Sequence, residues 1–188
     1  MKVYFSGSLY PQNEFQSRYM KIVNCLVSNG HEVMEDTTVS LYPEFLSKTE
    51  GELMENYSNV LRWIEKCDFA VFEASYPSSL SIGHEISVAL GKGKPVIVMY
   101  LDEKSPKFLL GNKNDMIIWA RYFNDLKRSD IDQALSKALE TVKNKVSMRF
   151  NLFIPRSLMA YLDWAAKDTG VNKSEYIRML IEKGVKRK

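Results

Sequence analysis

The sequence predicts an α/β protein in which helices cover both faces of a doubly wound, parallel, five-stranded sheet. Three observations support this fold class. Short apolar runs alternate with segments of helical periodicity through the first 145 residues. Residues 67–100 follow the order strand, loop, helix, strand, which is a unit from which parallel sheets are built. After Lys145 the pattern changes, and a small strand-helix-helix unit follows.

Each predicted strand and helix begins or ends at a recognisable signal in the sequence. The first apolar run alternates and is rich in bulky residues, and Gly7 marks the turn after it. The next segment has helical spacing and closes at Asn29-Gly30, a typical helix stop. The step Gly83-His84-Glu85 is expected to open a later helix. We expect strands at 1–5, 32–34, 69–73, 96–101 and 116–120. We expect helices at 14–27, about 53–64, about 85–91 and 130–145, with a loop at 102–114.

The last 40 residues predict a separate unit. Residues 148–154 alternate like a strand and end at Pro155. A helix then stops near Gly170, and Asn172 or Ser174 can cap a final helix. One strand and two short helices bury too little surface to be stable alone, so we expect this unit to pair with a second copy. The predicted domains are therefore 1–145 and 146–188.

Composition and charge narrow the class of protein. The 45% share of hydrophobic residues is enough to build a core. Cys25 and Cys67 are expected to be reduced, buried thiols, and no Cys/His cluster has zinc-ligand spacing, so no metal is predicted. No run is long enough to span a membrane, and the expected location is the cytoplasm. Residues 147–188 hold nine Lys and Arg against four Asp and Glu, which suggests two units with different partners.

Glu85 is the main candidate for chemistry. It is predicted in the first helical turn just after the carboxyl end of a strand, where ligands bind in open α/β sheets. The Gly7-Ser8 loop and a second loop with Ser79 and Gly83 could supply small residues and backbone amides for a sugar or phosphate. The ordinary alternative is a glutamate that only interacts favourably with the helix dipole.

Several sequence segments, taken together, form a pattern that is specific enough to indicate a family. VYFSGSL, WIEKCDFAVFE, SLSIGHEISVALGKGKPVIVMY and the Asn-x-Met that begins at Asn114 resemble the nucleoside 2-deoxyribosyltransferase superfamily, which includes the 2'-deoxynucleoside 5'-phosphate N-hydrolases. The resemblance covers about residues 2–125, and the SxxxGxE element is its sharpest part. It implies a flavodoxin- or Rossmann-like fold. It also implies that Glu85 attacks the anomeric carbon to form a covalent glycosyl-enzyme, with Tyr4 near it.

The same resemblance implies which residues bind the 5' end of the substrate and that the chains assemble into an oligomer. Ser8 matches a serine that binds the phosphate or 5' end. Ser79 matches a position that is Asp in the transferases acting on free nucleosides and Ser in the nucleotide hydrolases, so a 5'-phosphorylated substrate is favoured. Asn114 matches an asparagine lent to the neighbouring subunit's site, which implies a homodimer or tetramer. No metal or organic cofactor is implied.

Two departures from the family pattern concern the reaction. Val60 stands where the family usually has an Asp that helps to protonate the leaving base. Tyr10 stands where the nucleotide hydrolases have an Arg after Gly-Ser. A nucleophile without its acid suits leaving groups that need no proton, such as a cationic nicotinamide or an N7-alkylated purine. Alternatively, another group could replace the acid; the candidates are Tyr57, Asn59, Asp68 and Glu73.

The C-terminal unit resembles the ribbon-helix-helix repressors. The segment RFNLFIPR and the later GVNKSEYIRMLIEKG carry the resemblance. It implies a strand-paired dimer in which Arg149 and Asn151 could read base edges, while Lys173 could lie on phosphates. Phe153 stands where those repressors usually have a polar residue. A module that only dimerises is at least as strong an interpretation as DNA binding.

Together these inferences predict an enzyme that cleaves or transfers the N-glycosidic bond of a nucleoside 5'-monophosphate or a related nucleotide. Hydrolysis and transfer both remain open, as do the base and the sugar. The second hypothesis is a DNA-binding regulator that senses a nucleotide in the N-terminal pocket and reads DNA with the C-terminal unit.

Overall fold

A computed structural model describes residues 1–8, 14–35, 47–123, 127–146 and 153–185. The chain divides into two compact units, Met1–Ser147 and Met148–Lys188. The first unit holds a parallel sheet with helices on both faces, so the predicted fold class is confirmed. Across the described ranges, no helix has the length and apolar character needed to cross a membrane.

The sheet has five parallel strands in the order β2-β1-β3-β4-β5. This is the flavodoxin-like order, in which the chain changes direction between β1 and β3 and leaves a crevice at their carboxyl ends. Gly7 and Glu73 are register partners at this end. The strands are β1 (Lys2–Gly7), β2 (Glu32–Met34), β3 (Phe69–Glu73), β4 (Val96–Leu101) and β5 (Ile117–Tyr122).

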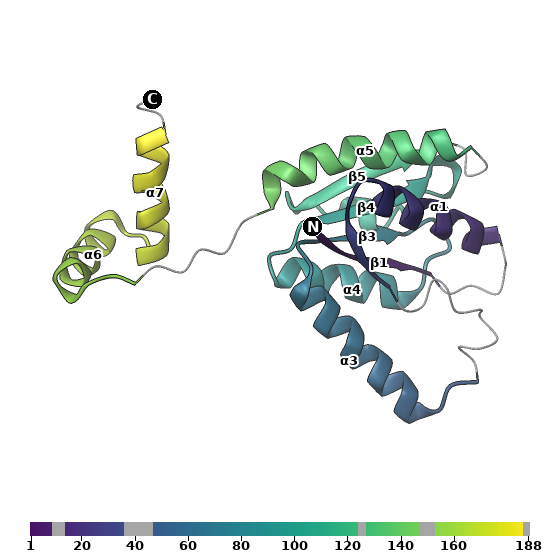
Figure 1. Ribbon diagram of the computed structural model, residues 1–188, viewed down its shortest axis with the longest axis horizontal. Helices are drawn as coiled ribbons and strands as arrows, with labels where there is room; N and C mark the ends of the chain where they lie inside the picture. The colour runs from purple at the N-terminus through teal and green to yellow at the C-terminus, as the bar shows by residue number, and fades with distance from the viewer. Residues whose placement is uncertain (9–13, 36–46, 124–126, 147–152, 186–188) are drawn as a thin grey trace. The chain divides into compact units, whose positions relative to one another are not determined.

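Helices cover both faces of the sheet, as Figure 1 shows. Helices α1 (Glu14–Ser28) and α5 (Arg128–Lys145) cover one face, and α3 (Glu50–Lys66) and α4 (Leu80–Gly91) cover the other. Alternation along β1 sends Val3 and Phe5 into the core under α1 and α5. Tyr4 belongs to the second core, under α3 and α4, and this face carries the candidate site.

Helix α4 begins earlier than the sequence suggested. It starts at Leu80 with Ser79 as its N-cap, rather than at the Gly83-His84-Glu85 step. Ile82 and Ile86 are both buried, so tertiary packing holds the first turn in place despite the glycine inside it. Glu85 therefore lies in the second turn of the helix, not in the first.

The described residues of the C-terminal unit, 153–185, form two helices, α6 (Arg156–Thr169) and α7 (Lys173–Val185). Gly170 ends α6 in the left-handed conformation, with φ of 71°, as a C-terminal glycine commonly does. The Asn172 side chain accepts a hydrogen bond of 2.9 Å from the Glu175 amide, so Asn172 rather than Ser174 supplies the cap. Most of the expected strand at 148–154 lies outside the described residues, and 153–155 have no regular secondary structure.

Candidate active site

The Glu85 carboxylate points from α4 toward the middle of β1. The Tyr4 hydroxyl donates a hydrogen bond of 2.8 Å to Glu85 Oε2. The Ser6 hydroxyl bonds the same carboxylate. Tyr4 and Ser6 are two residues apart on one strand, so both side chains point to the face that α4 covers. The carboxylate is therefore held from one side by two neutral donors.

The surroundings of Glu85 set its charge state. The side chain is half-buried, and loss of water around it raises the pKa of Glu85 above that of an ordinary carboxyl group. The hydrogen bonds from Tyr4 and Ser6, together with the nearby His84, act in the opposite direction and lower it. The balance is a poorly hydrated carboxylate in a fixed orientation, which suits a nucleophile.

Replacing Tyr4 with Phe should shift the acid limb of activity. If Glu85 reacts as the carboxylate, kcat/KM falls as pH drops through its pKa. Losing the Tyr4 hydrogen bond raises that pKa further, so the limb should move up by about one pH unit. A pH profile of base release measures this, with the buried Tyr100→Phe as the control. A limb that stays at the wild-type position would contradict an ionised Glu85 held by Tyr4.

Ser6 was not among the residues predicted from sequence. It is fully enclosed, with 2% of its surface exposed, and it joins the Tyr4–Glu85 pair. The signal was available, because the period of two along a strand places Ser6 on the same face as Tyr4. A polar residue inside an otherwise apolar strand, next to a predicted site, is the pattern that would have found it.

The predicted Gly7-Ser8 and Ser79 positions do come together. The backbone amide of Ser79 donates a hydrogen bond of 2.7 Å to Ser8 Oγ, and the Tyr19 hydroxyl donates one of 2.8 Å to the Ser8 carbonyl. A Cβ at Gly7 would lie 2.6 Å from Tyr19 Cζ, so glycine is needed there to seat this tyrosine. Ser8, directly after β1, is thus fixed against the N-terminus of α4.

Gly83 does not belong to a loop, contrary to the expectation from sequence. It lies inside the first turn of α4, and a Cβ there would meet no atom within 4 Å. Gly83 and Ser79 instead line an open groove of about 850 Å³, and Glu85 is not among the residues lining this groove. The other lining residues are Leu80 at the start of α4, two residues of the loop before α4, and residues 103–109. Glu85 lies two residues after Gly83 on α4, but it does not line this groove.

The remaining predicted residues lie elsewhere or outside the described ranges. Asn114 precedes β5 at the amino end of the sheet, where its side chain accepts a hydrogen bond of 2.9 Å from the Met116 amide. It does not meet Glu85 within one protomer. Lys173 forms an ion pair of 2.7 Å with Asp163. Arg149 and Asn151 lie outside the described residues. Over the described ranges there is no group of three or more potential metal ligands.

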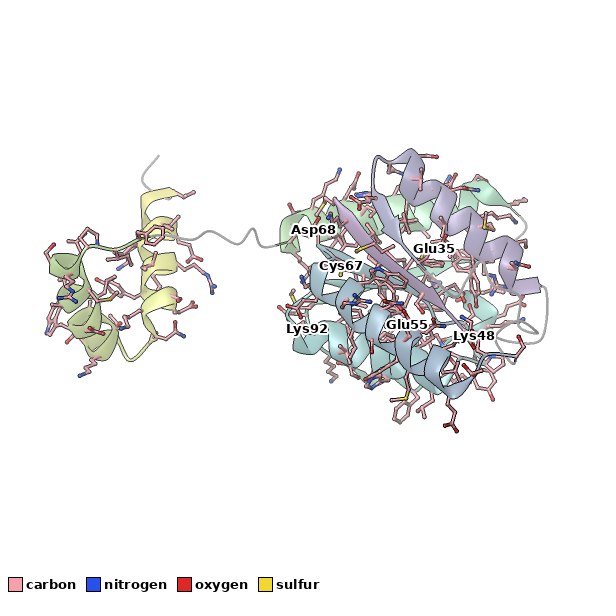
Figure 2. All side chains as sticks on the ribbon, turned by 60° about the horizontal axis from the view of Figure 1, so that its bottom comes forward. Glu35, Lys48, Glu55, Cys67, Asp68 and Lys92 are labelled. Carbon is pink, nitrogen blue, oxygen red and sulfur yellow. The ribbon has the colours of Figure 1, made fainter. Side chains whose placement is uncertain are left out.

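The four candidates for the missing acid have different surroundings in the structure. Val60 itself is buried in the same core cluster as Tyr4. Asp68 accepts a hydrogen bond from the Lys2 amide at the amino ends of the strands, and Figure 2 places it at the end of α3 away from Lys48. The Asn59 side chain accepts a hydrogen bond from Arg62 in its own helix. Glu73 is buried and ion-paired with Arg18.

Of the four candidates for the missing acid, Tyr57 alone contacts a residue adjacent to Glu85 in the chain. Its hydroxyl lies 2.9 Å from His84 Nε2, and the two rings are 5.8 Å apart. The pair links α3 to α4 at the residue that precedes the candidate nucleophile. From the sequence, His84 is only part of the step expected to open a helix, and Tyr57 lies seven helical positions before the core residue Ile64.

Comparison with known proteins gives the family. No family model matches the chain. A protein of Thermofilum pendens, provisionally named 2'-deoxynucleoside 5'-phosphate N-hydrolase 1, is 29% identical over 150 residues, which are 79% of this chain and all of the relative. A protein of Nematostella vectensis with the same provisional name is 31% identical over 102 residues, 53% of this chain and 67% of the relative.

A solved structure supports the fold. The CMP N-glycosidase BcmB of Clostridium botulinum superposes with a TM-score of 0.53 at 16% identity, covering 72% of this chain and 99% of that protein. The sequence relatives, this shared architecture and the predicted motifs agree over the N-terminal unit. The chain therefore belongs to the nucleoside 2-deoxyribosyltransferase-like family that contains these N-hydrolases.

Proposed function

We propose that the N-terminal unit cleaves the N-glycosidic bond of a nucleoside 5'-monophosphate, with Glu85 as the nucleophile. The observation that carries the proposal is the half-buried Glu85 carboxylate, held by Tyr4 and Ser6 beside the crevice of the sheet. The sequence relatives named as 2'-deoxynucleoside 5'-phosphate N-hydrolases support the same reaction class. Poorly hydrated carboxylates in such crevices are typical of reacting groups.

The reaction proceeds in two displacements. In the first, a Glu85 oxygen bonds to C1' of the sugar, and the electron pair of the C1'–N bond leaves with the base. Tyr4 and Ser6 orient the carboxylate, so that little reorganisation is needed at the moment of attack. In the second, water or another base attacks C1' and releases the Glu85 carboxylate. Two displacements at one carbon retain the configuration of the sugar.

The 5' phosphate is assigned to the Ser8 and Ser79 end of the pocket. Ser8 Oγ accepts the Ser79 amide, so its own hydrogen remains to donate elsewhere. Ser79 is also the N-cap of α4, and the positive end of the helix dipole favours a phosphate there. Serine at both positions offers hydrogen bonds without negative charge.

A panel of substrates tests this function. The wild-type protein should release free base from nucleoside 5'-monophosphates at least about tenfold faster, in kcat/KM, than from the matching nucleosides, because charge-assisted bonds hold the phosphate. Ser8→Ala should raise KM for the nucleotide and leave the slow nucleoside reaction unchanged. Chromatographic detection of free base measures both, with the exposed Ser58→Ala as the control. Equal rates on nucleosides and nucleotides would overturn the phosphate assignment.

We further propose that the C-terminal unit, residues 146–188, joins two copies of the chain. Large apolar side chains remain exposed on its two helices: Trp164 is 60% exposed, Ile181 63% and Leu158 55%. An unpaired apolar surface of this kind, on a unit of about 40 residues, is typical of a dimer interface. In the dimer, Asn114 of one copy would complete the pocket of the other, as the family resemblance implies.

Sedimentation or light scattering tests the dimer. The wild type should have the mass of a dimer or tetramer at micromolar concentration. Trp164→Glu combined with Ile181→Asp should reduce that mass, because a buried charge opposes the apolar contact. Lys167→Gln, an exposed change on the same helix, should leave the mass unaltered. A wild-type protein with the mass of one chain would contradict this proposal.

DNA binding remains a prediction from the sequence. Of its three residues, Lys173 is ion-paired with Asp163, and the other two lie outside the described ranges. No described contact favours it over dimerisation.

We propose the cytoplasm as the location of the protein, because Cys25 and Cys67 are buried, free thiols, as expected in a reducing compartment.

A further inference from the structure

The Tyr57–His84 pair lies next to Glu85 in the chain, where α3 meets α4. Tyr57 comes from α3, one helical turn before Val60, and His84 comes from α4, directly before Glu85. The Tyr57 oxygen is 2.9 Å from His84 Nε2, and the rings are tilted by 30°. Both side chains are open to solvent, with 48% of Tyr57 exposed, so a substrate can reach them.

Cleavage of an ordinary N-glycosidic bond needs such a proton donor. The departing nitrogen takes the bonding electron pair, and an unprotonated base is a poor leaving group. The other hydroxyls beside Glu85, from Tyr4 and Ser6, already donate to the carboxylate and help to keep it ionised. Asp68 lies at the opposite end of the strands, and Glu73 is enclosed with Arg18.

We propose that His84, positioned by Tyr57, is the general acid that protonates the leaving base. This inference rests on the function proposed above. The imidazolium of His84 gives one ring proton to the base nitrogen as the C1'–N bond breaks and the Glu85–C1' bond forms. Neutral His84 then accepts a proton from the water that attacks C1', which restores the imidazolium and the free carboxylate. Tyr57 holds the ring through Nε2 and does not itself react.

A proton donor at His84 determines which class of substrate the enzyme can cleave. With His84 as the acid, the enzyme acts on nucleotides whose bases are neutral and depart only when protonated. Val60, in the position of the family's acid, then does not restrict the chain to leaving groups that carry their own positive charge. Histidine is suited to this task because both of its ring nitrogens donate when it is protonated.

Leaving-group dependence tests the inference. Purified His84→Gln and Tyr57→Phe variants would be compared with wild type on two groups of nucleotides. The first holds ordinary nucleoside 5'-monophosphates, and the second holds nicotinamide mononucleotide and 7-methylguanosine 5'-monophosphate, each with ribose and with 2-deoxyribose. On the first group, His84→Gln should lower the rate of base release in the first turnover by about 100-fold. Tyr57→Phe, which keeps the ring contact but removes the hydroxyl, should lower it by about tenfold.

On the second group, whose bases leave without a proton, both variants should release the base of the first turnover at a rate within about threefold of wild type, because His84 accepts a proton only in the later attack of water. His31→Gln serves as the matched histidine control and should behave as wild type on both groups. Thermal melting checks that His84→Gln is folded, which its exposed position favours.

The outcomes separate this inference from the function on which it rests. Equal losses on both groups, or no loss on either, would exclude His84 as the acid. A wild type that cleaves only the second group would also exclude it and leave Glu85 chemistry intact. A wild type that cleaves neither group would overturn the proposed function and this inference together.

Discussion

Replacing Glu85 by glutamine should abolish cleavage of the N-glycosidic bond, with kcat/KM falling by at least about 10⁴-fold, as when a covalent nucleophile is removed. Glutamine has nearly the shape of glutamate and can still accept the Tyr4 hydrogen bond, so the pocket should keep its form. The amide is not nucleophilic enough to attack C1'. Chromatographic measurement of free base over hours gives the range needed to see this loss.

Two control measurements test whether the loss of activity is specific to the Glu85 carboxylate. Glu55→Gln makes the same chemical change at an exposed site on α3, and it should leave the rate and the melting temperature unchanged. Nucleotide binding to Glu85→Gln, measured by calorimetry, should persist, because the Ser8 and Ser79 end of the pocket is intact. Loss of binding together with activity would point to a structural rather than a chemical role.

The covalent intermediate gives an independent measurement. Rapid acid quenching of wild type with excess nucleotide should yield protein heavier by one sugar phosphate, because the Glu85–C1' ester outlives the departure of the base. The Glu85→Gln protein should show no such species. A Glu85→Gln variant that retains more than about a tenth of wild-type activity would refute the nucleophile assignment.

Local pattern was enough to predict most of the fold. The strands at β2, β3 and β4 have the bounds expected from their apolar runs, because these runs are flanked by clear turn and helix signals. The predicted start of α4 was wrong by several residues. The error has a general cause, because burial of Ile82 and Ile86 can extend a helix through a glycine that local propensity would treat as a boundary.

The site residues that could not be predicted from the sequence depend on contacts between elements far apart in the chain. The resemblance assigned Tyr4, and the structure places its hydroxyl on Glu85, 81 positions later in the chain. Ser6 and the Tyr57–His84 contact were not predicted, because each depends on which strand or helix lies opposite. Arg18 was overlooked for the same reason: a charged residue on a helix is usually solvated, and only the fold shows that this one is enclosed.

The buried Arg18–Glu73 pair should be the most sensitive point for stability. Each side chain is 1% exposed, and Arg18 Nη1 lies 3.5 Å from Glu73 Oε1. The Tyr122 hydroxyl donates a hydrogen bond of 2.7 Å to Glu73, and the Ser75 hydroxyl donates another. Ser75 Oγ in turn accepts the Leu101 amide at 2.8 Å, so the cluster ties β3 to the end of β4. Glu73 is a structural residue in this arrangement.

Arg18→Met should lower the free energy of unfolding by about 3–5 kcal/mol, since it leaves the Glu73 charge buried without its cation. Urea unfolding followed by circular dichroism measures this loss. The double variant Arg18→Met with Glu73→Gln should recover much of it, because the neutral amide oxygen can still accept from Tyr122. Arg62→Met, an exposed arginine change on α3, should have little effect.

The pH dependence separates a charge effect from a packing effect. Burial raises the pKa of Glu73 in the folded protein, although Arg18 and the two hydroxyl donors oppose the rise. Between the ordinary carboxyl pKa and the folded one, the native state binds more protons than the unfolded state, so stability falls as pH rises. Without Arg18 the folded pKa rises further. The Arg18→Met protein should therefore lose more stability relative to wild type at pH 8 than at pH 5, and an equal loss at both values would show that packing, not the unpaired charge, is responsible.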